Sequence, residues 1–274
     1  MPTRLGIVAG GGLLPGHIAH RCREQGREVF IVALEQQADP AVVEPWPHVW
    51  VRLGAAGTAI RHLREAGVEE VVMAGPVRRP SLSELRPDGR ALRFLARGAL
   101  SGGDDGLLSA VVRTLEEDEG FRIVSVQDVA GGLLARHGKL GAHEPGEDDQ
   151  ADIARGVKVL SALGAVDVGQ AVVVQAGVVL GVEAIEGTDA LIRRCGDLRR
   201  QGKGPVLIKL AKDGQEQRVD LPTIGPETVA GCRDAGFSGI AVEAGRSLIV
   251  DRDAAIAAAD AAGMFLVGLR LDAG

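Results

Sequence analysis

The first half of the chain alternates short apolar runs with glycine turns and helical stretches, and this order limits the fold more than any other feature. Leu5–Ala9 is an apolar run closed by three glycines, and a helical stretch follows over Pro15–Gln25. The runs Val29–Leu34, Val49–Leu53 and Val71–Ala74 repeat the pattern further along the chain. Strands that alternate with helices in this way predict a mostly parallel sheet with helices on its faces.

The composition of the sequence changes after Phe121–Val126, the last strand expected in the first half. Residues 135–150 are polar and rich in turn-forming residues. We therefore predict an α/β protein with a Rossmann-like parallel-sheet domain over residues 1–134, a linker over 135–150, and a second α/β domain over 151–274. A long surface loop inside one domain is the alternative to a linker, although loops of this length are uncommon in compact domains.

The second half is expected to begin with a helix over Asp152–Leu163. Two apolar runs follow within Ala171–Ala184, and Ala176-Gly177 between them predicts a β-hairpin. The remaining expected elements are helices over Leu191–Cys195, Glu227–Ala235 and Asp253–Ala262, and strands over Val206–Leu210, Gly239–Val242 and Phe265–Leu269.

Composition narrows the class of protein. The net charge of −6 argues against a nucleic-acid binder, which normally carries a basic surface. The three cysteines are far apart, so they form neither a disulfide framework nor a metal-ligand spacing, and we expect a reducing compartment. The sequence contains no signal-peptide pattern and no apolar run of about 20 residues, and we expect a cytoplasmic protein.

Two glycine-rich turns of the first half are candidate phosphate sites. Gly10–Gly12 lies between a strand and a helix, where open α/β sheets bind phosphate groups. Its spacing matches neither the dinucleotide motif nor a P-loop, and a tight turn without a ligand is the alternative. Gly75-Pro76 ends another strand, and Arg78 and Arg79 after it are suited to a diphosphate. A solvated arginine pair is the alternative.

Acidic residues at helix starts are candidates for metal binding. Asp104 and Asp105 follow two glycines and open a helix, so they can cap that helix or bind a metal ion. Glu183 lies at the end of the hairpin, and Thr188 and Asp189 begin a helix. Carboxylates beside a helix start suit a hard metal ion or a phosphate, whereas plain helix capping is the alternative.

The segment after the strand Val206–Leu210 carries Lys209, Lys212 and, further on, Asp220. Asp220 lies between two apolar residues, and a carboxylate in such a place needs a partner, which can be a metal ion, Arg218 or a lysine. A surface aspartate ahead of a turn is the alternative. Thr223 can cap the helix that follows, and the two lysines can offset phosphate charge.

Six stretches together resemble the UDP-2,3-diacylglucosamine pyrophosphatases of the LpxI type, which act in lipid A synthesis. These stretches are GIVAGGGLLP, AGPVRRP, GDDGLL, DVGQAVVVQAGVVLGVEAIEGTDALIRR, RVDLPTIGPETV and AGRSLIVDRD. The most specific are VEAIEGTDALIRR and RVDLPTIG. The resemblance covers nearly the whole chain and shows no departure in these two motifs.

The resemblance implies hydrolysis of UDP-2,3-diacylglucosamine to UMP and 2,3-diacylglucosamine 1-phosphate (lipid X), with water attacking the β-phosphorus. It implies an N-terminal domain that binds UDP, a C-terminal domain that holds the lipid product, an active site between them, and a requirement for Mg²⁺ or Mn²⁺. Asp220 takes the position of the family's catalytic aspartate and is expected to be a general base or a metal ligand.

Residues of the matching motifs and their neighbourhood are predicted to contact substrate or metal. Substrate contacts are assigned to Gly11, Gly12, Leu13, Arg78, Gln170, Gly187, Thr188, Asp189, Lys209, Lys212 and Thr223. Metal contacts are assigned to Asp220, Asp189, Glu183, Asp104 and Asp105. A UDP-sugar transferase and a non-catalytic sensor of a nucleotide-linked lipid remain as alternatives. Peripheral contact with the inner face of the membrane and a homodimer also stay open.

Overall fold

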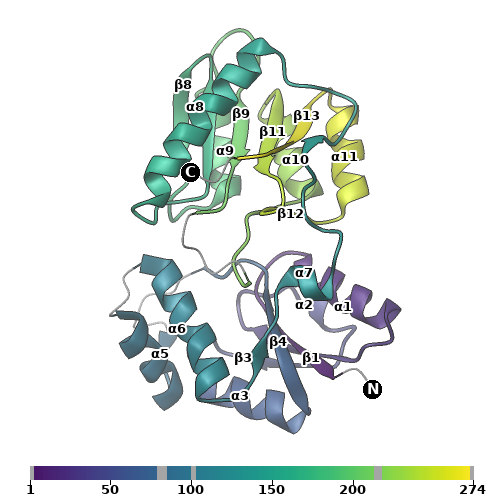
Figure 1. Ribbon diagram of the computed structural model, residues 1–274, viewed down its shortest axis with the longest axis vertical. Coiled ribbons are helices and arrows are strands. Elements are labelled where there is room, and N and C mark those ends of the chain that lie inside the picture. Colours follow the sequence, from purple (N-terminus) through teal and green to yellow (C-terminus); the bar gives the residue numbers. More distant parts are fainter. Residues whose placement is uncertain (1–2, 79–84, 100–102, 213–217, 272–274) are drawn as a thin grey trace. The chain divides into compact units, whose positions relative to one another are not determined.

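The structure is a computed structural model that describes residues 3–78, 85–99, 103–212 and 218–271 (Figure 1). Within these ranges it does not describe the side chains of residues 95, 97–99, 103–105 and 107. The chain forms two compact units. The first contains Met1–Gly132 and the short segment Glu216–Asp220, and the second contains Leu133–Gln215 and Leu221–Gly274.

The first unit is built on a five-stranded sheet of order β3-β2-β1-β4-β5, in which all neighbouring strands are parallel. This confirms the parallel sheet expected from the sequence, and the order is that of the first five strands of a doubly wound fold. Its elements are β1 (Arg4–Ala9), α1 (Leu14–Glu24), β2 (Val29–Leu34), α2 (Pro40–Val43), β3 (His48–Val51), α3 (Ala56–Glu65), β4 (Val68–Ala74), α5 (Gly89–Ala99), α6 (Gly103–Glu117), β5 (Arg122–Ile123) and α7 (Val126–Val129).

Helices cover both faces of this sheet, which is why its central strands are apolar almost throughout. In strand β1, Ile7 is fully buried and lies opposite Ile31 of β2 and Val72 of β4. Helix α1 packs with α2 and α7, whereas α3 packs with α5, which in turn packs with α6 (Figure 1).

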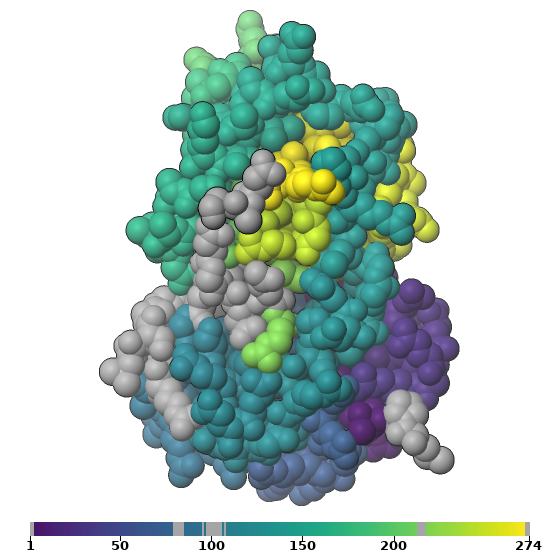
Figure 2. All heavy atoms as spheres, viewed as in Figure 1, coloured from purple at the N-terminus to yellow at the C-terminus, as the bar shows by residue number. Residues whose placement is uncertain are grey.

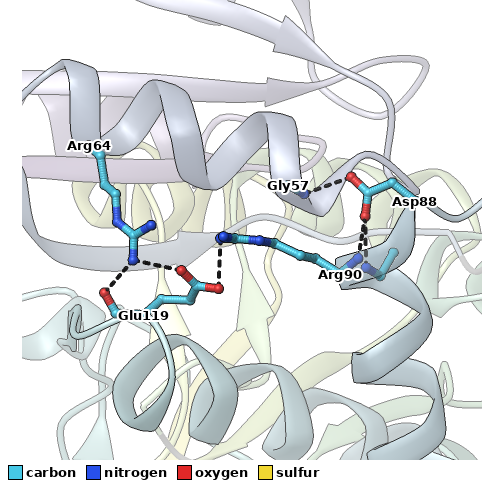
Figure 3. Close-up of polar contacts among 6 residues, drawn as sticks. Gly57, Arg64, Asp88, Arg90 and Glu119 are labelled. Carbon is cyan, nitrogen blue, oxygen red and sulfur yellow. Dashed lines mark hydrogen bonds and ion pairs between the residues drawn. The ribbon is translucent and has the colours of Figure 1, made fainter.

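Polar contacts connect α3, α5 and the end of α6 (Figure 3). The carboxylate of Glu119, just after α6, accepts hydrogen bonds of 2.7 Å from Arg64 of α3 and from Arg90 of α5. Asp88 accepts from the amide of Gly57 at 2.7 Å and from amides of the first turn of α5. These contacts fix the start of α5 against α3.

The strand predicted over Phe121–Val126 is wrong beyond Ile123. Ser125 begins helix α7 with a capping box, because its hydroxyl accepts from the amide of Asp128 at 3.2 Å while Asp128 accepts from the amide of Ser125 at 3.0 Å. The reciprocal bonds satisfy amides at the helix start, so the chain turns into a helix there and the strand ends early.

The second unit has a mixed six-stranded sheet of order β6-β13-β11-β9-β7-β8 and a parallel pair β10-β12. Helix α8 packs on β7 and β9, and α9 and α10 pack beside α11 on a separate apolar cluster. Its elements are β6 (Gly138–Lys139), α8 (Glu147–Gly164), β7 (Ala171–Gln175), β8 (Val178–Val182), α9 (Thr188–Asp197), β9 (Val206–Lys209), β10 (Thr223–Ile224), α10 (Pro226–Asp234), β11 (Gly239–Glu243), β12 (Leu248–Ile249), α11 (Arg252–Ala261) and β13 (Phe265–Leu269).

The predicted hairpin is confirmed as β7 and β8. Ala176 and Gly177 at its turn both have positive φ angles, 50° and 74°. The carboxylate of Asp152, in α8, accepts from the amides of Ala176 at 2.9 Å and Gly177 at 2.6 Å. A carboxylate on a neighbouring helix therefore satisfies the two turn amides.

Residues 135–150, which the sequence predicts to be a linker, contain strand β6 and the first turn of α8. Strand β6 pairs antiparallel with β13, and the amide of Ala135 donates to the carbonyl of Ser247 at 2.9 Å. These contacts lie within the second unit. Across the described ranges, we find no helix that combines the length and the apolarity needed to cross a membrane.

The segment Glu216–Asp220, of which the structure describes residues 218–220, belongs to the first unit although the chain on both sides of it belongs to the second. Val219 packs against the apolar cluster formed around β4, α3 and α6, and Arg218 donates to Glu116 of α6 at 2.7 Å. In Figure 2 the described part of this segment is the small light-green patch among teal atoms. Asp220 therefore sits on the first unit although most of its sequence neighbours belong to the second.

Candidate active site

The carboxyl edge of the first sheet holds the glycine turn predicted to bind phosphate. Strand β1 leads to Gly10–Gly12, and β4, its neighbour in the sheet, leads to Gly75-Pro76. The chain continues from β1 to β2 on one side, whereas β4 lies on the other side. This is the topological switch point, where open α/β sheets bind ligands.

The two glycine turns pack directly on each other. Gly11 donates from its amide to the carbonyl of Pro76 at 2.8 Å. A Cβ atom on Gly10 would overlap with that carbonyl oxygen, and one on Gly75 would overlap with the carbonyl oxygen of Gly11. The close approach of the two backbones therefore explains why glycine is needed at these positions, even without a ligand. The same approach sets the shape of the sheet edge where a ligand would bind.

The other predicted residues of the first unit surround this edge in part. Leu13 precedes α1, is 40% exposed and lies at a helix start that has no side-chain cap. Arg78 donates from its amide to the side chain of Gln37 at 2.8 Å, and its own side chain is exposed. Arg79 lies outside the described residues, as do the side chains of Asp104 and Asp105, whose backbone forms the start of α6.

A second candidate site lies at the carboxyl edge of the second sheet, around Lys209 at the end of β9. The residue is 8% exposed. Its ammonium donates to the hydroxyl oxygen of Thr188 at 2.8 Å and to the carbonyl oxygen of Thr223 at 3.2 Å. Three residues far apart in sequence, all predicted as substrate contacts, are thereby brought together.

Glu183 and Gln170 complete this cluster. The hydroxyl of Thr188 donates to one carboxylate oxygen of Glu183 at 2.5 Å, and the amide of Gln170 donates to the other at 3.0 Å. Glu183 is 9% exposed. A continuous chain of hydrogen bonds therefore runs from the ammonium through the hydroxyl to the carboxylate.

The electrostatics of this cluster favour an anion. Thr188 is the first residue of helix α9, and Gly187 before it has a φ of 79° and offers no side-chain cap. The helix start carries partial positive charge, and its first amides have no partner within the helix. The ammonium of Lys209 adds a full charge beside it. Two positive groups at one place suit an anion such as a phosphate.

The loop between β8 and α9 is held in a fixed shape. Arg194 of α9 donates to the carboxylate of Glu186 at 2.7 Å and to the carbonyl of Val182 at 2.6 Å, and Glu186 accepts from the amide of Ala184 at 3.1 Å. The hydrogen bond from Arg194 lowers the pKa of Glu186. Ile185 lies in this loop between Ala184 and Glu186, and it is 93% exposed.

Lys212 differs from Lys209 in its pairing. It is 9% exposed and forms an ion pair with Asp167. Its carbonyl accepts from Arg246 at 3.2 Å, and Arg246 is paired with Glu243 at 3.0 Å. This network lies at the end of β11. In it the charge of Lys212 is paired directly with the carboxylate of Asp167.

The carboxylates predicted as metal ligands do not share one described cluster. Asp189 is exposed in the first turn of α9, Glu183 is buried beside Thr188, and Asp220 belongs to the first unit. Among described residues, the structure has no group of three or more His, Cys, Asp or Glu side chains that could hold a metal ion. A Mg²⁺ ion bound through one or two carboxylates and substrate phosphates does not need such a group.

Sequence reasoning did not select Gln37, Ile185 or Asp167. Gln37 follows the buried strand β2, so its place at the carboxyl edge was a usable signal. The exposure of Ile185 and the pairing of Asp167 with Lys212 depend on tertiary contacts, and no local pattern announces either one.

Comparison with known proteins covers both units. Family models described as the LpxI N-terminal domain and the LpxI C-terminal domain match residues 4–133 and 136–267. The curated protein UDP-2,3-diacylglucosamine pyrophosphatase LpxI of Caulobacter vibrioides is 42% identical over 97% of this chain and 97% of its own length.

Solved structures show only distant likeness. A CobK precorrin-6A reductase is 16% identical with a TM-score of 0.35, covering 99% of this chain and 89% of its own. The UDP-glucose 4-epimerase of Thermus thermophilus is 14% identical with a TM-score of 0.33, covering 98% and 86%. Neither likeness bears on the assignment, which rests on the two family domains and the 42% identical relative: this chain belongs to the LpxI family.

Proposed function

We propose that this protein hydrolyses the pyrophosphate bond of UDP-2,3-diacylglucosamine to UMP and 2,3-diacylglucosamine 1-phosphate, a step of lipid A synthesis. The named activity of the 42% identical relative supports the reaction. The structural observation that carries the proposal is the buried ammonium of Lys209 at the start of helix α9, a place suited to a phosphate group.

In the second unit, Lys209 and the first amides of α9 bind the phosphate that stays with the sugar. Lysine has three ammonium donors, and two of those on Lys209 have partners among the residues that the structure describes. No described carboxylate lies within 4.0 Å of this ammonium. Its direct partners among the described residues are therefore neutral oxygens, and a phosphate oxygen is a better partner. Gln170, Thr223 and Lys212 support the same edge.

In the first unit, the switch-point edge binds the nucleotide. Gly11 and Gly12 bring backbone close to the ligand, and Gly12 has a φ of 72° that a side chain would strain. Leu13 is an apolar contact and Arg78 a cation for the nucleotide phosphate. This role uses the ordinary position of ligands in a sheet of this order.

The chemical step is attack of water on phosphorus. The water oxygen forms a bond to the β-phosphorus, and the bond from that phosphorus to the bridging oxygen breaks, so that the bridging oxygen leaves with UMP. Asp220 takes the water proton or, with a metal ion bound, would be a ligand of that ion. When bound, the metal ion supplies neutralisation of the charge that develops on the phosphate oxygens.

The lipid part of the substrate needs apolar contacts. Ile185 is almost fully exposed beside the phosphate site, at two residues from Glu183 and three from Thr188. We assign it to contact with an acyl chain. A substrate with two acyl chains resides in a membrane, so the cytoplasmic protein is proposed to meet it at the inner membrane surface.

The test is a product assay with purified protein and UDP-2,3-diacylglucosamine, with and without Mg²⁺. Metal-dependent release of UMP and lipid X is expected. Asp220→Ala should abolish turnover and retain substrate binding. Transfer of the group to an acceptor other than water would favour a transferase, and binding of the intact substrate without any UMP would favour a sensor.

A further inference from the structure

Glu183 is a buried carboxylate beside the proposed phosphate site, and both of its oxygens have protein donors. One accepts from the hydroxyl of Thr188 and the other from the amide of Gln170. Its backbone is also fixed, because its amide donates to the carbonyl of Ala171 at 2.8 Å. Gly169, with a φ of 58°, passes so close that a Cβ atom there would overlap with the Glu183 carbonyl oxygen.

The direction of the hydrogen bonds in this cluster follows from chemistry. Lysine can only donate, so the hydroxyl oxygen of Thr188 accepts from Lys209. The single proton of that hydroxyl is then left for Glu183, which as a carboxylate can only accept. Each group has one role, and the threonine oxygen presents its lone pairs to the ammonium.

We propose that Glu183 is a positioning residue: through Thr188 it fixes the ammonium of Lys209 at the start of α9 without pairing with it directly. A direct ion pair would neutralise the lysine, whereas a hydroxyl between the two charges sets its position and leaves the charge for an anion. The proposal rests on the role of Lys209 in the proposed function.

Lys212 provides an internal contrast. It is as buried as Lys209, at 9% against 8% exposed, yet it pairs directly with Asp167. Two lysines on neighbouring parts of one sheet edge therefore differ in how their charge is offset. Lys209, which is linked to its carboxylate through the hydroxyl of Thr188, is the lysine that lies beside a helix start.

A role as metal ligand fits Glu183 poorly. A cation at its carboxylate would lie close to the ammonium that the same Thr188 hydroxyl binds, and two positive charges repel each other. The other predicted ligand of this unit, Asp189, is exposed on α9, and its side chain has no described contact with Glu183.

The experiment measures binding of inorganic phosphate in the absence of metal, by titration calorimetry, and separately the Mg²⁺ concentration for half-maximal UMP release. Glu183→Gln and Thr188→Val should weaken metal-free phosphate binding about tenfold, because a hydrogen bond to a charged group is lost or misdirected. Both should leave the Mg²⁺ dependence unchanged. Thr188→Ser keeps the hydroxyl and should bind phosphate like the wild type.

Glu186→Gln is the matched control, because it is the same substitution three residues away, on a carboxylate paired with Arg194. It should leave phosphate affinity unchanged. A higher Mg²⁺ requirement in Glu183→Gln with normal phosphate binding would make Glu183 a metal ligand and overturn the proposal, as would a wild type that binds no phosphate. Absence of UMP release by the wild type would instead count against the proposed function, while the phosphate titration would still test the role of Glu183.

Discussion

The ammonium of Lys209 lies 2.8 Å from the hydroxyl oxygen of Thr188, the first residue of helix α9. The lysine comes from the end of a buried strand and the threonine from a helix start, and 20 residues separate them in sequence. A full positive charge is thereby held beside the positive end of a helix. This arrangement is unfavourable by itself and becomes favourable when an anion binds.

Replacing Lys209 by methionine removes this charge and keeps most of the apolar stem. We expect kcat/KM for UDP-2,3-diacylglucosamine to fall roughly 10²–10³-fold, the effect of losing one preorganised donor to a developing charge. Steady-state kinetics of UMP release measure it, and a thermal melt of the variant verifies folding. Lys209→Arg keeps a cation and should retain part of the activity. If Lys209→Met had the same kcat/KM as the wild type, Lys209 would not contribute to the active site.

Replacing Ile185 by aspartate tests the acyl contact. We expect KM for the diacylated substrate to rise roughly ten- to hundred-fold with kcat unchanged, because burying an aliphatic side chain contributes that much to binding. UDP-glucosamine without acyl chains should compete equally well against both proteins. Leu198→Asp is the control, since this side chain is 53% exposed at the other end of α9. Equal KM shifts in the two variants would contradict a specific contact.

Replacing Asp152 by alanine leaves the amides of Ala176 and Gly177 without their acceptor. The free energy of unfolding should drop by about 2 kcal/mol, because two turn amides lose their hydrogen bonds to a charged and buried carboxylate. Urea denaturation measures the loss. Asp148→Ala removes an exposed acid from the same helix and should change stability by less than about 1 kcal/mol. A similar loss in both variants would show that the turn contacts are unimportant.

The ion pair of Glu186 with Arg194 predicts a pH dependence. The pKa of Glu186 is lowered in the folded state, chiefly by the hydrogen bond from Arg194. Its contribution to stability is therefore complete above the pKa of the unfolded chain and is lost as the pH falls through the folded pKa. The Glu186 side chain is 29% exposed, so solvent weakens the ion pair. We therefore expect the free energy of unfolding at pH 7 to be higher in the wild type than in Glu186→Gln by less than about 1 kcal/mol. Urea denaturation at low pH should find no difference, and a difference that grew toward acid would be incompatible with the ion pair.

The sequence by itself determined the element order of both units. Apolar runs such as Val29–Leu34 and Phe265–Leu269 are strands because a buried parallel strand must be apolar on both faces. The hairpin at Ala176-Gly177 was equally predictable, since Gly177 lies between two apolar runs and glycine readily takes the positive φ angle of a tight turn. Short elements such as β6 and β10 were missed, because two-residue strands leave no periodicity to recognise.

Only the tertiary structure decided how the predicted site residues group. Lys209, Thr188, Glu183 and Thr223 meet because a strand end, a helix start and a two-residue strand converge at one sheet edge. Asp220 joins the first unit because Val219 and Arg218 find their partners there. A motif shows which side chains the chain carries. Contacts between distant segments decide which of these side chains meet and which charged groups pair. The local sequence therefore predicted the residues, whereas long-range packing brought Lys209 to the Glu183–Thr188 pair and gave it no direct carboxylate partner among the described residues.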